Sequence, residues 1–573
     1  MQRSINPKSL AESDLDKSAG RSPQPASLLT GLAALLLVVP IAVYGWFLFR
    51  YAVNIPKWDD HVLKFFLLNF REANTWTERF YQLFKQHNEH RIVYDRLVSG
   101  IDYLIFGKLN YIHLMVIGNL SLIGLLALFA KALRRAQVPL WMALPVALLL
   151  FNLAQWENMY WGMAALQNFT VILLIFATLY VLSFRPQLGW LAFALAIAAT
   201  LTSGNGLVVW PIGLALLLLR QNFGGTMRWL LAMVLAIRIY FINYQTPPGN
   251  PPVKVSFLAL FKGWLAFNGA GAEAFATIHP FASYYPIGVL ITLVTLALCL
   301  YRLWTYLKGQ TLSAWDLFYL GGAAFLLGTG VIVTHSRAGF GLETLLTSRY
   351  KIYSLLLFGL TICYGITLIR ARQRTFLALG ATFFSFVLAA LSYTYYLGDT
   401  IMLRKILVTY QFNWTYTQNK PESTIDAVTQ SLLDNQPAFY DRCLPTLFGA
   451  VSHTPVTHLD TVYQTGAAYT FRSTSFPVLG LQDEGAYLVA RSAKRVYLFP
   501  TRQTQTNSRR ALLESERVLG PGFTAQIEEA ELENGVYTVQ LLQVNKGSDC
   551  QLFSTGQQMN IARQAAPVFQ KNW

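Results

Sequence analysis

The chain has 573 residues, of which 54% are hydrophobic and only 13% are charged. A soluble protein carries about 25% charged residues, so this composition excludes an ordinary soluble protein and indicates many membrane spans. The formal net charge is +16, but the cations are spread over short loops between apolar runs, where they set membrane topology. We therefore expect membrane lipids around the chain and no nucleic acid partner.

Residues 1–27 are polar and rich in Ser, Pro and basic side chains, which predicts a disordered cytoplasmic tail. The apolar run that follows contains Pro40 and ends without a small-residue cleavage pattern. It predicts a retained first span rather than a removed signal peptide.

Apolar runs between residues 28 and 397 predict a polytopic α-helical membrane domain with about 11 transmembrane helices. The runs lie at 28–50, 111–131, 138–155, 165–184, 188–203, 206–220, 228–244, 284–302, 315–334, 351–369 and 375–397. The two runs that flank residues 203–206 are short, which predicts that this turn dips into the membrane or into a cavity.

Short loops that carry Lys or Arg alternate with loops that are poor in cations. Because cytoplasmic loops hold the excess of basic residues, we expect the N-terminus in the cytoplasm. The segments expected outside are 51–110, 156–164, 203–206, 245–283, 335–350 and the chain after 398. This pattern predicts a multi-pass protein of a bacterial-type cytoplasmic (inner) membrane, with a periplasmic C-terminal domain.

The first external loop, residues 51–110, is long and charged but also periodic in its apolar residues. Amphipathic helices are expected near 62–70, 76–84 and 97–106, lying along the membrane surface. A further amphipathic piece is expected at 257–267 in a later external loop.

Two segments follow the membrane domain. Residues 398–454 are expected to form a helical connector, and residues 455–573 alternate apolar and polar side chains, which predicts an extracytoplasmic β-sandwich-like domain. Cys443 and Cys550 lie in this outer region, where they either form a disulfide or remain thiols. Cys299 and Cys363 fall inside apolar runs and are expected to be core thiols.

Two adjacent acids, Asp59 and Asp60, follow the first span together with His61. Neighbouring side chains diverge in direction, so one acid is expected to face a substrate while the other meets a helix N-terminus or a cation. The alternative is that the acids simply cap the helix that begins at His61, since Asp is favoured at such positions.

The same loop carries His87, Glu89, His90 and Arg91. On a helix, residues three apart share a face, so the two histidines would suit a metal pair, although two ligands are a weak signal. Glu89 and Arg91 would instead orient a phosphate or a sugar. An ordinary polar surface is the alternative.

Glu157, Trp161 and Asn205 lie in other external turns. An aromatic face combined with amides and carboxylates suits carbohydrate binding. The alternative is an interfacial aromatic belt next to a turn, but that alternative gives Glu157 no partner at the membrane.

An outward basic rim opposes the positive-inside trend. It comprises His335, Arg337, Arg349 and Lys351, and Arg suits bidentate contact with a phosphate. Snorkelling to anionic lipid headgroups is the alternative. Arg238 falls within a predicted span, so it is expected to face a cavity or a partner such as Glu157. The sequence contains no Walker loop, HExxH or GxSxG motif, so ATP-driven transport and serine-hydrolase chemistry lack support.

The layout resembles the GT-C superfamily of integral-membrane glycosyltransferases, which includes protein O-mannosyltransferases, aminoarabinose transferases and oligosaccharyltransferases. The layout covers residues 28–397, whereas the motif is only Trp58-Asp59-Asp60. The resemblance implies a polyprenyl-phosphate-linked sugar donor. It also implies that Asp59 or Asp60 acts as general base or holds a divalent cation, Mg²⁺ or Mn²⁺. His335, Arg337, Arg349 and Lys351 would bind the donor phosphate, whereas the first-loop histidines, Glu157 and Asn205 match no family motif.

We therefore expect an inverting glycosyltransferase that acts on the outer membrane face, with a glycan, lipid or protein as acceptor. Because the candidate residues converge on one face, the catalytic interpretation of the acids is favoured over capping, with a preference for Asp60. Three alternatives remain: a transporter or flippase of lipid-linked glycans, a polymerase of such glycans, and a non-catalytic subunit of an envelope complex.

Overall fold

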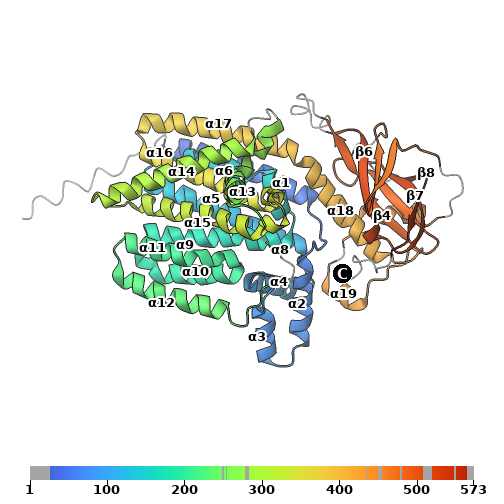
Figure 1. Ribbon diagram of the computed structural model, residues 1–573, viewed down its shortest axis with the longest axis horizontal. Coiled ribbons are helices and arrows are strands. Elements are labelled where there is room, and N and C mark those ends of the chain that lie inside the picture. The colour runs from blue at the N-terminus through green and yellow to red at the C-terminus, as the bar shows by residue number, and fades with distance from the viewer. Residues whose placement is uncertain are drawn as a thin grey trace, which may run out of the picture.

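The computed structural model describes residues 26–247, 251–252, 254–277, 283–434, 436–449, 455–477, 480–506, 519–546 and 550–563. A bundle of apolar helices lies at one end and a β-sandwich at the other, and α18 (Leu397–Thr415) joins them (Figure 1). The predicted N-terminal tail lies outside the described residues, apart from the two that begin α1 (Ala26–Tyr51).

Nine helices within the described residues are long and apolar enough to cross a membrane. They are Gly31–Tyr51, Tyr111–Arg135, Leu140–Met159, Gly162–Phe184, Phe223–Tyr240, Tyr284–Leu307, Ala314–Phe340, Ser348–Leu368 and Ala371–Tyr395. The chain is therefore a multi-pass membrane protein, as predicted. The remaining two of the eleven predicted runs are shorter helices, Pro186–Thr202 and Gly204–Leu219, which adjoin at the turn expected to dip inward.

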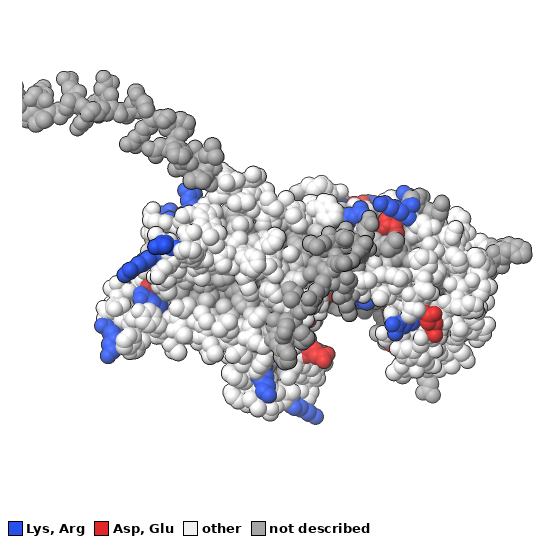
Figure 2. Space-filling view, turned by 90° about the horizontal axis from the view of Figure 1, so that it is seen from above, with Lys and Arg blue, Asp and Glu red and all other residues white. Residues whose placement is uncertain are grey.

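The longer helices of the bundle, besides α1, are α5 (Tyr111–Arg135), α9 (Thr170–Phe184), α10 (Gly189–Thr202), α11 (Val209–Leu219), α12 (Phe223–Tyr240), α13 (Phe257–Gly269), α14 (Tyr284–Leu307), α15 (Ala314–Arg337), α16 (Lys351–Leu368) and α17 (Ala371–Tyr395). Shorter pieces are η1 (Leu140–Ala143), α6 (Leu144–Leu150), η2 (Leu153–Gln155), α7 (Trp156–Met159), α8 (Gly162–Ala164), η3 (Ala165–Phe169), η4 (Pro186–Leu188), η5 (Gly204–Val208), η6 (Ala270–Thr277), η8 (Ala338–Phe340), η9 (Leu342–Leu346) and η10 (Ser348–Tyr350). On the face shown in Figure 2 the middle of the bundle is uncharged, and Lys and Arg appear at its end away from the sandwich.

Three helices fill the loop at residues 51–110, here called the first loop, at the predicted positions: α2 (Asp60–Glu72), α3 (Trp76–Phe84) and α4 (Val93–Phe106). In Figure 1, α2 and α3 run across the direction of the spans. A capping box between Thr75 and Glu78 starts α3. This helix exposes the apolar side chains of Trp76 and Phe80, as expected of a helix that lies on a membrane surface.

The C-terminal β-sheet prediction is confirmed. The strands are β1 (Thr461–Thr465), β2 (Ala468–Ser473), β3 (Gly485–Arg491), β4 (Val496–Pro500), β5 (Arg502–Gln505), β6 (Leu519–Glu528), β7 (Gly535–Val544) and β8 (Cys550–Ile561). They form two antiparallel sheets, ordered β1-β2-β6-β5 and β4-β3-β7-β8. One core lies between the sheets, with Phe471 and Phe523 from the first and Leu488 and Leu541 from the second.

The second sheet also has a buried outer face. Tyr487 and Val489 point away from the sandwich core and join the hydrophobic cluster of the helical part, because α18 packs over β4. On α18, the Asn413 amide donates to the Leu498 carbonyl (2.9 Å) and accepts from the Leu498 N–H (2.7 Å). These contacts hold the sandwich against the helical part of the molecule.

The connector contains α19 (Ala427–Leu432), η11 (Phe439–Cys443) and α20 (Leu444–Phe448), and a short η14 (Glu529–Glu531) follows β6. Cys443 and Cys550 form a disulfide between this connector and β8, which decides between the two alternatives for these residues. Cys363 is a buried thiol as expected, whereas Cys299 is only half-buried.

Candidate functional site

Two cavities flank the start of the first loop, residues 51–110. The first, here called the membrane-side cavity, has a volume of about 640 Å³ and lies among the first loop, the 203–208 turn and the outer ends of α12, α15 and α16. The second, here called the sandwich-side cavity, has a volume of about 790 Å³ and lies among the first loop, α7, α18 and the β-sandwich. Asp59 lines both cavities.

Eight of the residues proposed from the sequence meet at the membrane-side cavity, although they come from five separate segments. They are Asp59, His87, Glu89, His90, Trp161, Asn205, Arg337 and Arg349. The expectation that acids, aromatics and cations of the outer loops converge is therefore met for this subset.

The two adjacent acids have different environments. The side chain of Asp59 is 43% exposed, whereas Asp60 is fully buried. The Asp60 carboxylate accepts hydrogen bonds from the backbone N–H groups of Lys57 (3.0 Å) and Met163 (2.7 Å). Burial raises the pKa of Asp60 to about 7. Our preference for Asp60 as the catalytic acid is therefore corrected, because its oxygens serve the backbone rather than a cavity.

The residue before the two acids, Trp58, has a strained backbone conformation. Trp58 has φ 46°, a left-handed conformation that costs roughly 1–2 kcal/mol for a residue other than glycine. Its ring meets Trp161 edge-on at 5.3 Å, and the Lys57 ammonium lies over both rings, at 4.5 Å and 4.7 Å from their centroids. Strained residues held by their surroundings cluster at functional sites.

Asp59 does not cap α2, since its side chain makes no capping hydrogen bond. Its Oδ1 lies 3.6 Å from Nε2 of His87. Burial raises the pKa of Asp59, but His87, Arg349 and His90 lower it by more, so the pKa of this carboxyl lies below its ordinary value. At neutral pH the group is an ionised carboxylate between two cavities.

His87 and His90 lie in a tight turn rather than on a helix, which corrects the expected helical pairing. Their backbones pair in both directions at 2.8 Å, and Asn88 between them has φ 46°. Nδ1 of His90 accepts a hydrogen bond from the Gly204 N–H at 3.1 Å. Burial lowers the pKa of His90 to about 4, so this ring is neutral and anchors the 203–206 turn.

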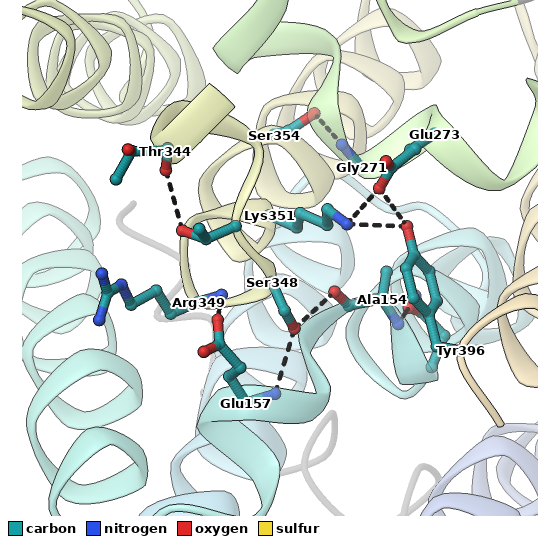
Figure 3. Close-up of polar contacts among 12 residues, drawn as sticks. Ala154, Glu157, Gly271, Glu273, Thr344, Ser348, Arg349, Lys351, Ser354 and Tyr396 are labelled. Atoms are coloured by element: carbon teal, nitrogen blue, oxygen red, sulfur yellow. Dashed lines mark hydrogen bonds and ion pairs between the residues drawn. The ribbon is translucent and has the colours of Figure 1, made fainter. Parts of the chain in front are cut away.

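The cations of the cavity are engaged to different extents. Arg337 Nη1 lies 3.5 Å from Oε1 of Glu89. The Arg349 backbone N–H donates to Glu157, whereas the Arg349 guanidinium extends away from that network (Figure 3). Among the described residues no carboxylate lies within 4 Å of the Arg349 guanidinium, and its Nε is buried without a hydrogen bond. This cation is therefore available to an anion.

Three buried N–H donors of the cavity lining lack acceptors within the described part of the chain: Trp161 Nε1, Gln167 Nε2 and Arg349 Nε. Gln167 lies in the π-helical turn η3, a type of distortion that is frequent at functional sites. Unpaired buried donors are costly, so this lining favours a ligand rich in acceptor oxygens. The sequence already groups Gln167 with Glu157 and Trp161, as an amide that suits carbohydrate hydroxyls, but it does not reveal the π turn that holds this side chain.

Tyr244, Tyr350 and Tyr353 also line the cavity and were not predicted. Their one sequence signal is a position near helix ends, which is equally typical of an interfacial aromatic belt. Asn205 reaches the cavity while donating to the Tyr353 hydroxyl (3.0 Å) and accepting from Thr329 (3.2 Å).

Besides Asp60 and Glu157, four predicted site residues do not line this cavity. Arg91 donates to the backbone carbonyls of Phe84, Tyr240 and Ile242, so it fastens loops together. Lys351 is 3% exposed, and its ammonium pairs with Glu273 and donates a hydrogen bond to the Tyr396 hydroxyl (Figure 3).

The other two are His335 and Arg238, which are both exposed and absent from the cavity lining. Arg238 lies in the last turn of α12 rather than mid-span, which removes the reason to expect a buried partner.

Glu157 lies between the two cavities and lines the sandwich side. Its Oε1 is 3.6 Å from the Lys57 ammonium, and its Oε2 accepts from the Arg349 N–H at 3.3 Å. Lys57, rather than Arg238, is thus its partner. The pair positions Arg349 through its backbone.

The sandwich-side cavity is acidic and aromatic. Its lining includes Trp58 and Trp156 from the first loop and α7, and Asp399, Tyr410 and Glu531 from α18 and the sandwich. Asp399 pairs with Arg502 of β5 at 2.8 Å. Burial raises the pKa of Glu531 to about 7.

The adjacent acids do not fit a shared divalent cation, because the Asp60 oxygens already accept N–H groups while Asp59 points elsewhere. Over the described ranges, no group of three or more His, Cys, Asp or Glu side chains is arranged to hold a metal ion. The expected Mg²⁺ or Mn²⁺ site on Asp59 and Asp60 therefore has no donor set here.

Comparison of the chain with protein-family models, with curated proteins and with solved structures finds no match. What the site does must therefore be inferred from its residues and geometry.

Proposed function

We propose that the protein is an inverting membrane glycosyltransferase. It would move a sugar from a polyprenyl-phosphate-linked donor to an acceptor on the outer face of a bacterial-type cytoplasmic membrane. The observation that carries the proposal is the position of Asp59, an ionised carboxylate that lines both cavities. A general base in direct displacement must reach the acceptor hydroxyl while the donor lies on the other side.

The membrane-side cavity supports binding of the donor. The leaving group is a lipid phosphate whose negative charge grows in the transition state and needs cations. Arg349 offers a free guanidinium there, and Arg337 offers a second one that Glu89 holds in place. Trp161, Asn205 and Gln167 add an aromatic face and amides that suit the sugar hydroxyls.

The sandwich-side cavity supports binding of the acceptor. Trp58, Trp156 and Tyr410 suit the C–H faces of a glycan, and the carboxylates of Glu157, Asp399 and Glu531 suit its hydroxyls. The β-sandwich would thereby contribute to the choice of acceptor. Asp59 takes the acceptor proton as the new bond forms at the anomeric carbon and the prenyl phosphate leaves.

Two further observations support the proposed orientation of the protein in the membrane, with the β-sandwich on the periplasmic side. The Cys443–Cys550 disulfide belongs in an oxidising compartment, which for a bacterial-type cell is the periplasm. Cations gather at the opposite end of the bundle, as expected of a cytoplasmic side (Figure 2).

The test uses the full-length protein, purified in detergent and incubated with radiolabelled prenyl-phosphate monosaccharides and a delipidated envelope extract as acceptor. Transfer of label by the wild type, lost in Asp59→Asn, is the expected result. A transporter or flippase would bind the donor but release no prenyl phosphate in detergent. Equal transfer by the wild type and Asp59→Asn would overturn the assignment of the base.

A further inference from the structure

A basic groove lies at the end of the bundle away from the β-sandwich. It has a volume of about 680 Å³ and runs between α5, α9 and α10. Its cations are Lys131, Arg134 and Arg135 near the end of α5 and Arg185 just after α9. We call this feature the basal groove.

The cations of the basal groove are unengaged. All four are exposed, and within the described part of the chain none of their side chains forms a hydrogen bond or an ion pair. The described lining of the groove contains no Asp or Glu. Four cations held close together without counter-charges repel one another, so an anion that enters the groove is favoured.

Three other cations at the same end, Arg302, Arg220 and Arg374, have partners, unlike the four that surround the basal groove. Arg302 forms two hydrogen bonds with Asp316, at 2.9 Å and 2.6 Å. Arg220 donates to the carbonyls at the end of α9, and Arg374 donates to the Ile369 carbonyl at 2.8 Å. A general excess of positive charge on the cytoplasmic side does not by itself leave four cations unpaired around one concavity.

The groove has a polar end and an apolar end. Leu128, Lys131 and Arg135 share one face of α5, because they lie three and four residues apart. Charge therefore lies at the helix end and leucine lies one turn deeper. Leu191 and Leu195 of α10 extend the apolar wall in the same groove. This arrangement matches a molecule with an anionic head and a hydrocarbon chain.

We propose that the basal groove binds the headgroup of an anionic phospholipid from the adjacent leaflet, with an acyl chain along Leu128, Leu191 and Leu195. Lys and Arg attract anionic lipid headgroups at this position, and basic pockets between spans bind such headgroups. Four cations exceed the charge of one phosphate, so a doubly anionic diphosphatidylglycerol should bind more tightly than phosphatidylglycerol. The proposal is independent of the glycosyltransferase function.

The test compares the wild-type full-length protein with two matched fourfold variants. The groove variant carries Lys131→Gln, Arg134→Gln, Arg135→Gln and Arg185→Gln. The control variant carries Arg228→Gln, Lys308→Gln, Arg370→Gln and Arg372→Gln, which removes four exposed charges at the same end but outside the groove. Binding is measured by native mass spectrometry and by thermal shift in mixed micelles of phosphatidylcholine with added diphosphatidylglycerol.

The wild type and the control variant should bind diphosphatidylglycerol, and the groove variant should bind it roughly a hundredfold more weakly. Equal affinity of the groove variant and the wild type would overturn the proposal, as would an equal loss in the control variant. If glycerophosphate competes for the groove as effectively as the lipid does, the proposed contact of an acyl chain with the leucines is wrong. If the groove variant does not fold, the double variant with Lys131→Gln and Arg185→Gln replaces it in the test. Unchanged affinity of the double variant for diphosphatidylglycerol would also overturn the proposal.

Discussion

Oδ1 of Asp59 lies 3.6 Å from Nε2 of His87, at the junction of two cavities, while the adjacent Asp60 is fully buried. This relationship separates two acids that are neighbours in sequence. Asp59 is therefore the candidate base at the cavities, whereas Asp60 holds the local backbone in place.

Asp59→Asn should lower transfer by about 100- to 10,000-fold, the contribution typical of a general base. The amide cannot take the acceptor proton, but it keeps the size of the side chain, so the melting temperature should hardly change. The matched control is Glu72→Gln, an exposed acid on the same helix. Radiolabel transfer and thermal unfolding measure both effects, and equal activity of Asp59→Asn and the control would contradict the role.

Asp60→Ala should destabilise the fold by about 1–3 kcal/mol for each backbone N–H that it leaves unsatisfied. The affected donors are those of Lys57 and Met163. Thermal unfolding followed by tryptophan fluorescence measures the loss. An unchanged melting temperature in Asp60→Ala would show that these hydrogen bonds do not support the fold.

Stability should also depend on pH through Asp60. Its pKa is raised from 3.8 to about 7 in the folded protein, so the fold favours the protonated form. The associated stability is complete below pH 3.8 and is lost as the pH rises toward 7. The melting temperature of the wild type should therefore fall more steeply between about pH 4 and pH 7 than that of the non-titrating Asp60→Asn. Parallel curves would argue against this assignment.

Arg349→Gln should affect activity and Lys351→Gln should affect stability, although the two residues are only two positions apart. Arg349 has a free guanidinium, so its loss should weaken donor binding and lower transfer by about 100-fold without unfolding the protein. Lys351 neutralises Glu273 in a buried site, so its loss should cost roughly 3 kcal/mol of stability.

The control for this pair is His335→Gln, which is exposed and should change neither property. Binding of a prenyl phosphate and thermal unfolding, measured on all three variants, distinguish the roles. A destabilised Arg349→Gln with normal donor binding would contradict the proposed phosphate contact.

Removal of the Cys443–Cys550 disulfide should lower the stability of the C-terminal domain. The bond joins residues 107 positions apart, and closing so long a loop is worth about 5 kcal/mol in the chain-entropy model. Cys443→Ser with Cys550→Ser should lower the melting temperature, as should a reductant acting on the wild type. Thiol labelling under denaturing, non-reducing conditions should modify two of the four cysteines, Cys299 and Cys363. Labelling of all four would exclude the bond.

Much of the architecture followed from local pattern. Apolar runs predicted the spans, because a helix in lipid must be apolar over its length, and residues 62–106 showed the helical period of α2, α3 and α4. Alternation predicted the strands, because successive side chains of a strand point to opposite faces. Candidates from the loops that we expected outside, among them His87, Glu89 and Arg337, line one cavity.

The sequence by itself therefore determined the membrane helices and the β-rich end, since both depend on hydrophobicity patterns that are local in the chain. Only the tertiary structure decided which candidates are free. Asp60 is occupied by Met163, which is 103 residues away, and Lys351 by Glu273, which is 78 residues away. Asp59 keeps one exposed side toward the cavities beside its contact with His87, and in the described part of the chain no carboxylate lies within 4 Å of the Arg349 guanidinium. The type of a residue determines the charge of its side chain. Whether that charge is free to bind a ligand depends on contacts that form only in the folded protein.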